Sequence, residues 1–195
     1  MDGRRRSAGD SGVGRGLNRE DGVMKHEIQR KMVEILERCM DMTIATIRSD
    51  GSPQATVVSF VHDGLLLYFG CGAGSQKAMN ISRDPRVSVA MTAPYQNWLE
   101  IKGLSIAATA TEVVAPSELT EVGGLMLRRF PQISAIQPTE AAPVKLFKVR
   151  PTIVSVLDYS LGFGHTDLVK IEAGDIAETL DSMRHHWLAS AVVTS

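Results

Sequence analysis

The sequence is short of the features that mark several common protein classes. Only two cysteines occur, Cys39 and Cys71, too few for a disulfide scaffold or a thiolate zinc site, so a reducing cytoplasm is the expected compartment. The 21 basic and 22 acidic side chains give a formal net charge of -1, which supplies no overall attraction to nucleic acid or to an anionic membrane. No apolar run approaches the roughly 20 residues of a membrane span. We therefore expect no metal site, no nucleic-acid partner and no membrane partner.

Length and composition are typical of one globular domain with flanking segments. The chain has 195 residues, of which 44% are hydrophobic and 22% charged, so most of it can form a packed core. Residues 1–22 differ, because they hold six of the 17 glycines and only four apolar side chains. We expect a flexible leader at 1–23, a main domain at 24–160, and a C-terminal loop, short strand and docking helix at 161–195.

Apolar residues recur at helical spacing after Met24. They are Ile28, Met32, Ile35, Leu36 and Cys39. Charged residues occupy most of the intervening positions, so the spacing predicts an amphipathic helix of about four turns that covers one side of a core.

The middle of the chain alternates apolar and polar residues, which is the pattern of β-strands. Turn sequences at 49–53 and 62–64 separate the first three strands and predict successive hairpins. We expect strands at 42–48, 54–61, 65–69, 86–92, within 98–114, 145–149 and 152–157, and a helix at 116–129. Many short strands with few helices predict a closed or nearly closed antiparallel barrel.

A glycine-rich segment, residues 70–81, lies between the third and fourth expected strands. Its glycines allow backbone N–H groups to approach a ligand, and Ser75 is a good N-cap for a short helix. A helix N-terminus that carries the side chains of Ser75, Gln76 and Lys77 suits a phosphate group. The segment lacks the Walker order of residues, and by itself it fits a plain turn followed by a capped helix equally well.

The order of the motifs is more specific than any one of them. The motifs are Gly51-Ser52-Pro53, Thr56-Val57-Val58-Ser59, Leu67-Tyr68-Phe69, Ser75-Gln76-Lys77-Ala78-Met79-Asn80 and Arg83-Asp84-Pro85-Arg86-Val87. In this order the chain resembles the pyridoxamine 5'-phosphate oxidase-like family of FMN-binding split β-barrels, over roughly Ile28 to Tyr159. The resemblance implies a mainly β (α+β) fold, a six-stranded antiparallel split β-barrel with flanking helices. It also implies a homodimer with FMN at the subunit interface.

The resemblance further implies three groups of cofactor-binding residues. In such proteins the second strand lays its backbone along the flavin ring, the segment after the third strand holds the phosphate, and a later strand approaches the pyrimidine edge. The matching positions are Thr56, Val57, Val58 and Ser59 for the ring; Ser75, Gln76, Lys77 and Asn80 at the phosphate; and Lys102 and Ser105 at the pyrimidine edge. Gln76 stands where relatives carry Arg, so one bidentate phosphate donor is missing.

The activity that the resemblance implies is hydride transfer through flavin N5, with a small-molecule substrate and with no protein nucleophile required. Oxidation of pyridoxamine phosphate itself is not expected. The substrate-binding Lys of those oxidases falls near Val61, and no Arg-x-His follows Tyr159. We assign no catalytic residue from the sequence.

Two other functions stay open on the same fold. One is a haem-binding or haem-degrading split barrel, with His165 or a histidine of the tail as iron ligand. The other is a non-catalytic flavin-binding module. The loop at 159–167, with Phe163 and His165, would either cap a flavin ring or form an ordinary turn. A helix is expected at 175–189, on which His185 and His186 point about 100° apart and so do not converge on a metal.

Overall fold

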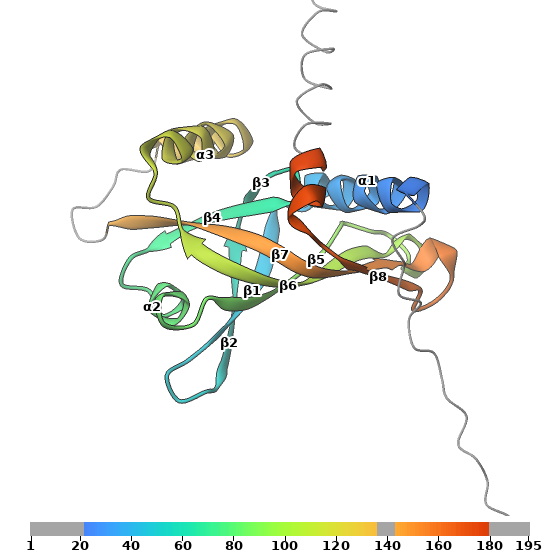
Figure 1. Ribbon diagram of the computed structural model, residues 1–195, viewed down its shortest axis with the longest axis horizontal. Helices are drawn as coiled ribbons and strands as arrows, with labels where there is room; N and C mark the ends of the chain where they lie inside the picture. The colour runs from blue at the N-terminus through green and yellow to red at the C-terminus, as the bar shows by residue number, and fades with distance from the viewer. Residues whose placement is uncertain (1–21, 136–142, 180–195) are drawn as a thin grey trace, which may run out of the picture.

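The alternating sequence folds into one curled antiparallel sheet, seen in the computed structural model in Figure 1, which describes residues 22–135 and 143–179. Its strands are β1 (Asp41–Ile47), β2 (Pro53–Ser59), β3 (Val61–Asp63), β4 (Leu66–Gly72), β5 (Arg86–Thr92), β6 (Lys102–Glu112), β7 (Val144–Asp158) and β8 (Thr166–Lys170). The strand order is β2-β1-β5-β6-β7-β4-β3, with β8 paired to β7. The labelled α-helices are α1 (Gly22–Arg38), α2 (Gln76–Arg83) and α3 (Pro116–Arg129), and a further helical segment at 173–179 follows β8. Three 3-10 turns are η1 (Trp98–Glu100), η2 (Pro131–Ala135) and η3 (Tyr159–Leu161).

The sheet curls because its two terminal strands are consecutive in the chain. β2 and β3 stand at opposite ends of the strand order but are joined through the single residue Phe60, whose side chain is fully buried. β2 pairs with β1, whereas β3 pairs with β4. The mainly β, split-barrel prediction is confirmed.

The sheet has eight strands in the described ranges, against the six of the expected barrel, and two of the predicted strand boundaries also differ. The predicted strand at 54–61 is two strands, because the chain changes partner at Phe60. The predicted strands at 145–149 and 152–157 are one long strand, β7, which continues through Pro151. Beside that proline the pairing with β6 shifts from Ala107–Ile153 to Ala108–Pro151, so Thr152 is an extra residue of β7.

The core lies between the inner face of the sheet and α1. Met32, Ile35 and Leu36 of α1 are each no more than 2% exposed, and they belong to the same buried cluster as Ile44 and Val89. Burial of each such side chain contributes about 1.5–3 kcal/mol of hydrophobic stabilisation. The predicted helix is confirmed; it begins at Gly22 and ends at Arg38.

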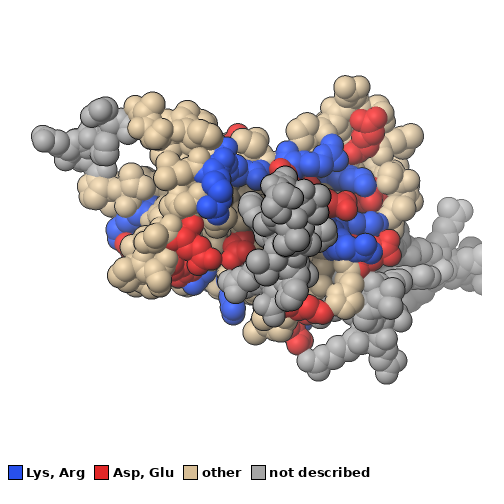
Figure 2. Space-filling model, turned by 90° about the horizontal axis from the view of Figure 1, so that it is seen from above, with Lys and Arg blue, Asp and Glu red and all other residues tan. Residues whose placement is uncertain are grey.

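Two of the helices, α1 and α3, lie on the same side of the sheet, and α2 lies on the other. In Figure 1, α1 and α3 both lie above the sheet, and Figure 2, viewed from that side, shows Lys, Arg, Asp and Glu side chains intermingled.

Over the described ranges, no helix is long and apolar enough to cross a membrane.

The ends of the chain were predicted to carry a leader and a docking helix. Almost all of the leader at 1–23 lies outside the described residues. Residues 173–179 are helical and Ile176 is buried, in agreement with the start of the expected helix at 175–189. The rest of that helix, with His185 and His186, also lies outside them.

Candidate functional site

The N-terminus of α2 is organised by Ser75. This residue is extended (φ -69, ψ 148), and its hydroxyl accepts a hydrogen bond from the backbone N of Ala78 at 3.4 Å. The same hydroxyl donates to Cys71 Sγ at 3.4 Å. The first backbone N–H groups of α2 have no partner within the helix. Lys77 is half-buried there and makes no hydrogen bond or ion pair with any residue that the structure describes. A helix N-terminus with an uncommitted ammonium group can bind a phosphate.

The glycines before α2 leave open space around its N-terminus. A Cβ built on Gly72 or Gly74 would meet no atom within 4 Å, and neither residue has a positive φ. By contrast, a Cβ on Gly70 would lie 3.3 Å from Leu146 Cδ2. The backbone conformation and packing of the chain therefore do not require glycine at 72 and 74, and the space left there can admit a ligand close to the backbone.

Asn80 fastens α2 to the barrel. Its side chain is 0% exposed. Its Nδ2 donates to Thr46 Oγ1 at 2.9 Å and to Gln54 Oε1 at 3.1 Å, and its Oδ1 accepts from Gln76 Nε2 at 2.9 Å. Both amide N–H groups and the amide oxygen are engaged, so Asn80 holds α2 beside β1 and β2. Sequence reasoning missed Thr46 and Gln54, although each is a polar residue at an inward position of an alternating strand.

β2, the predicted flavin strand, is an edge strand. Among the described strands only β1 pairs with it, so its other edge has unpaired backbone N–H and C=O groups. Thr56 and Val58 point inward, and the Thr56 hydroxyl is buried without a hydrogen-bond partner. Val57 points outward and is 68% exposed, while Ser59 donates to Asp41 Oδ1 at 2.6 Å. The strand thus offers both free backbone groups and one unsatisfied side-chain group.

Outward-pointing residues of six strands form two cross-strand rows. One row is Val57, Thr43, Ala90, Ser105, Ser155 and Leu168. The other is Ala55, Ala45, Ser88, Ala107, Ile153 and Lys170. We call these twelve residues the outer face. It brings two predicted site residues, Val57 and Ser105, into the same row, and Lys170 at its edge is its single charged member.

Lys102 does not join this face. It lies three residues before Ser105, and residues an odd number apart in a strand point to opposite sides of the sheet. Its Nζ lies 3.7 Å from Asp158 Oδ2, as does the Nζ of Lys31, at a pocket under α1. Burial acts to raise the pKa of Asp158, but hydrogen bonds from Ser160 and the charge of Lys102 outweigh it and lower that pKa. The side chains of Lys102 and Ser105 therefore lie on opposite faces of the sheet, and their place at the pyrimidine edge stays a prediction.

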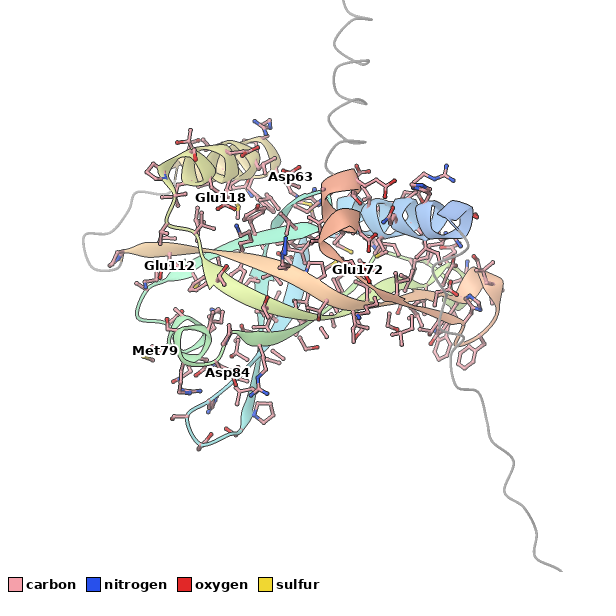
Figure 3. All side chains as sticks on the ribbon, viewed as in Figure 1. Asp63, Met79, Asp84, Glu112, Glu118 and Glu172 are labelled. Carbon is pink, nitrogen blue, oxygen red and sulfur yellow. The ribbon has the colours of Figure 1, made fainter. Side chains whose placement is uncertain are left out.

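The histidine proposed as an iron ligand lies in the loop between η3 and β8. His165 Nε2 is 3.3 Å from Asp167 Oδ2, and the imidazole is partly exposed. Within residues 22–135 and 143–179, no group of three or more His, Cys, Asp and Glu side chains could hold a metal ion. Figure 3 shows that this loop and α2 are far apart, since Met79 of α2 and Asp84 lie on the opposite side of the view from β8.

Comparisons with known proteins show the family and the fold of the chain. Residues 28–158 match the family model described as pyridoxamine 5'-phosphate oxidase. A heme binding protein from Mycobacterium smegmatis has TM-score 0.63 at 18% identity, covering 79% of this chain and 60% of that one. The chain thus spans well under two thirds of that relative's length.

Two further solved structures share the fold. A candidate pyridoxamine 5'-phosphate oxidase from Listeria innocua has TM-score 0.54 at 22% identity, covering 67% of this chain and 98% of that one. A heme storage protein from Vibrio cholerae has TM-score 0.53 at 23% identity, covering 63% and 88%. At these identities the likeness shows the fold alone. No curated protein matched the chain.

Proposed function

Because the chain belongs to the pyridoxamine 5'-phosphate oxidase family, we propose that it is a cytoplasmic FMN-dependent oxidoreductase that acts on a small molecule as a homodimer. The observation that carries this proposal is the α2 N-terminus. There, neither an acceptor for Lys77 nor a side chain that fills the space at Gly72 and Gly74 is found among the described residues.

The phosphate of FMN fits the α2 N-terminus on chemical grounds. A dianion there would accept hydrogen bonds from the free backbone N–H groups and a charge-assisted bond from Lys77. The Ser75 hydroxyl, now shared between Cys71 and Ala78, is a further donor at the same point. Gln76 donates one N–H of its amide to Asn80 Oδ1, and the second N–H of that amide is left to donate to the phosphate.

The flavin ring fits β2. Its unpaired edge offers hydrogen-bond donors and acceptors to the polar rim of a planar ring, and the Thr56 hydroxyl is buried without a partner. A buried unsatisfied hydroxyl costs about 1–3 kcal/mol, which a ligand atom would recover.

The outer face supports the homodimer. Its residues are small or apolar and almost uncharged, although several of them are exposed. An almost uncharged sheet face of this kind is typical of a surface that packs against another protein, in contrast to the charged helix side in Figure 2. Bound FMN would supply hydride transfer at its ring. The chain would supply the binding groups and exclude water from the ring.

Haem binding is the second candidate function. Two structural relatives are named for heme binding or heme storage. His165 favours it, because a carboxylate on one imidazole nitrogen orients the ring and leaves the other nitrogen free for a metal.

One titration tests the proposal. Purified chain freed of small molecules is titrated with FMN, and separately with haem, and binding is followed by flavin fluorescence quenching and by the haem Soret band. We expect FMN to saturate at one molecule per chain and haem to bind only weakly. Saturable haem binding that is lost in His165→Ala, without FMN binding, would overturn the flavin assignment. Reoxidation of the reduced, bound flavin then separates an oxidoreductase from a flavin-binding module.

A further inference from the structure

A small pocket lies between α1 and the sheet, on the opposite side of the sheet from α2. In Figure 1, α1 lies above the end of the sheet at which β6 begins and β7 ends. The pocket has a volume of about 40 Å³. Since one water molecule needs about 10–15 Å³ of such space, the pocket admits about three water-sized atoms. We call it the α1 pocket. Its charged residues are Lys31, Glu34 and Arg38 of α1, Lys102 of β6 and Asp158 of β7.

The charges of the α1 pocket do not balance. Three of its side chains are cationic and two are acidic, so the lining carries one net positive charge. The two acids differ in position, because Glu34 is exposed at the rim whereas the Asp158 side chain is only 4% exposed. Buried charges are stable in proteins when they are paired, so the pocket is suited to a ligand with a single negative charge.

The two ammonium groups of the pocket lack a close acceptor. The Nζ atoms of Lys31 and Lys102 each lie 3.7 Å from Asp158 Oδ2. A charge-assisted N–H···O bond measures about 2.7–2.9 Å, so neither ammonium is hydrogen-bonded to that carboxylate. The other oxygen, Oδ1, accepts from the backbone N–H and the hydroxyl of Ser160. Within the described ranges neither ammonium has another acceptor, although each carries three donors.

Arg38 and two apolar side chains complete the pocket. Nη2 of Arg38 donates to the Pro94 carbonyl at 2.9 Å, and the remaining guanidinium N–H groups have no partner in the part of the chain that the structure describes. Ile35 and Val156, which are 2% and 1% exposed, form the apolar part of the lining. A short carboxylic acid matches both parts. Its carboxylate carries one negative charge and two acceptor oxygens, and its alkyl group can pack against Ile35 and Val156.

We propose that the α1 pocket binds a short-chain monocarboxylic acid, whose carboxylate accepts hydrogen bonds from Lys31, Lys102 and Arg38. This site is additional to the flavin site of the proposed function and does not depend on it. A second acidic group on the ligand would face Glu34 at the rim. A phosphate is larger than the pocket admits and carries more negative charge than the lining balances. Both features favour a monocarboxylate.

The first experiment measures acetate binding to the full chain freed of flavin. Backbone amide NMR signals are followed as sodium acetate is added, with sodium chloride holding the ionic strength constant. We expect saturable shifts at Lys31, Lys102 and Asp158, while the signals of α2 do not move. Shifts that are absent, that do not saturate or that appear only outside the pocket would overturn the inference.

Inorganic phosphate tests the class of anion. It is titrated on Lys77→Ala, so that the proposed phosphate site at α2 does not report on the result. We expect phosphate to bind the α1 pocket at least tenfold more weakly than acetate. Phosphate binding at the pocket as tight as that of acetate, or tighter, would overturn the assignment to a carboxylate.

Substitutions on α1 test which residues hold the acetate. Lys31→Met, which keeps the length of the side chain, and Arg38→Gln should each weaken acetate binding at least tenfold. Arg30→Met removes an exposed cation of the same helix that does not line the pocket, and it should leave acetate binding within twofold of the wild type. Circular dichroism establishes that each variant is folded. Acetate affinities of both Lys31→Met and Arg38→Gln within twofold of the wild type would overturn the inference.

FMN titrations of the same variants separate this site from the flavin site. Lys102 is left unchanged, because it is also a predicted cofactor residue. We expect Lys31→Met and Arg38→Gln to bind FMN within twofold of the wild type. Parallel losses of FMN and acetate in these variants would make the pocket part of the flavin site and overturn the inference. A wild-type chain that binds acetate as described but does not bind FMN would overturn the proposed function and leave the α1 pocket supported.

Discussion

Removal of the Lys77 ammonium is the sharpest test of the phosphate site. Lys77 is the second residue of α2 and lies beside Ser75, and the described residues offer its ammonium no acceptor. The Lys77 ammonium would donate a charge-assisted hydrogen bond to a phosphate at this helix end, and that bond is worth about 1.5–3 kcal/mol. Lys77→Ala should accordingly weaken FMN binding roughly ten- to a hundredfold.

The assay compares two ligands on three proteins. Fluorescence-quench titrations of FMN and of riboflavin, which lacks the phosphate, are made on the wild type, on Lys77→Ala and on Arg128→Ala. Arg128 is an exposed cation of α3, remote in the chain from α2, and controls for the loss of one positive charge. Riboflavin should bind all three proteins almost equally, and Arg128→Ala should bind FMN like the wild type.

Two outcomes would refute this reasoning. An FMN affinity of Lys77→Ala within twofold of the wild type would mean that Lys77 is only a solvated helix residue. Equal losses for FMN and riboflavin would mean that the substitution damages the fold. Neither result is compatible with a phosphate contact at Lys77.

Three further perturbations test other parts of the structure. Asn80→Ala should lower the free energy of unfolding by about 1–3 kcal/mol in urea titrations, because Thr46 and Gln54 lose their buried partner, and an unchanged value would contradict the network. Gly103→Ala should destabilise by about 1–3 kcal/mol, since its Cβ would lie 2.8 Å from the Met91 carbonyl oxygen, whereas Gly72→Ala should leave stability unchanged and weaken FMN binding. Burial lowers the pKa of His62. The charge of Arg129 lowers it further, and a hydrogen bond to the Gly64 carbonyl raises it by less than these two effects lower it. The unfolded chain therefore binds the proton more readily than the folded chain. The stability that this group contributes is present above the unfolded pKa of about 6.5 and is lost as the pH falls, and His62→Gln should remove that part of the acid sensitivity in unfolding curves at pH 5.5 and 7.5.

Local patterns were sufficient to predict the elements that depend on local chemistry. The apolar spacing from Ile28 to Leu36 identified α1, and the turn at 49–53 identified the hairpin of β1 and β2. The Ser75 cap was also correctly identified, because a hydroxyl before a helix has few other roles.

Features set by distant partners could not be read from the sequence. The strand break at Phe60 arises because β3 pairs with β4 on the other side of the split, and no local signal marks that change of partner. The inward orientation of Lys102 depends on strand register. A slip of one residue would turn its side chain to the other face of the sheet. Trp98 and Phe163 are more than sixty positions apart, and only the meeting of η1 and η3 brings them together.

The absorption spectrum of the protein as purified from cells tests the central claim most directly. A chain that holds FMN at α2 and β2 should show flavin bands in the blue and near-ultraviolet. On denaturation it should release one green-fluorescent FMN per chain, and Lys77→Ala should carry much less. An intense Soret band without flavin bands, lost in His165→Ala and unaffected in Lys77→Ala, would contradict the account and assign the fold to haem.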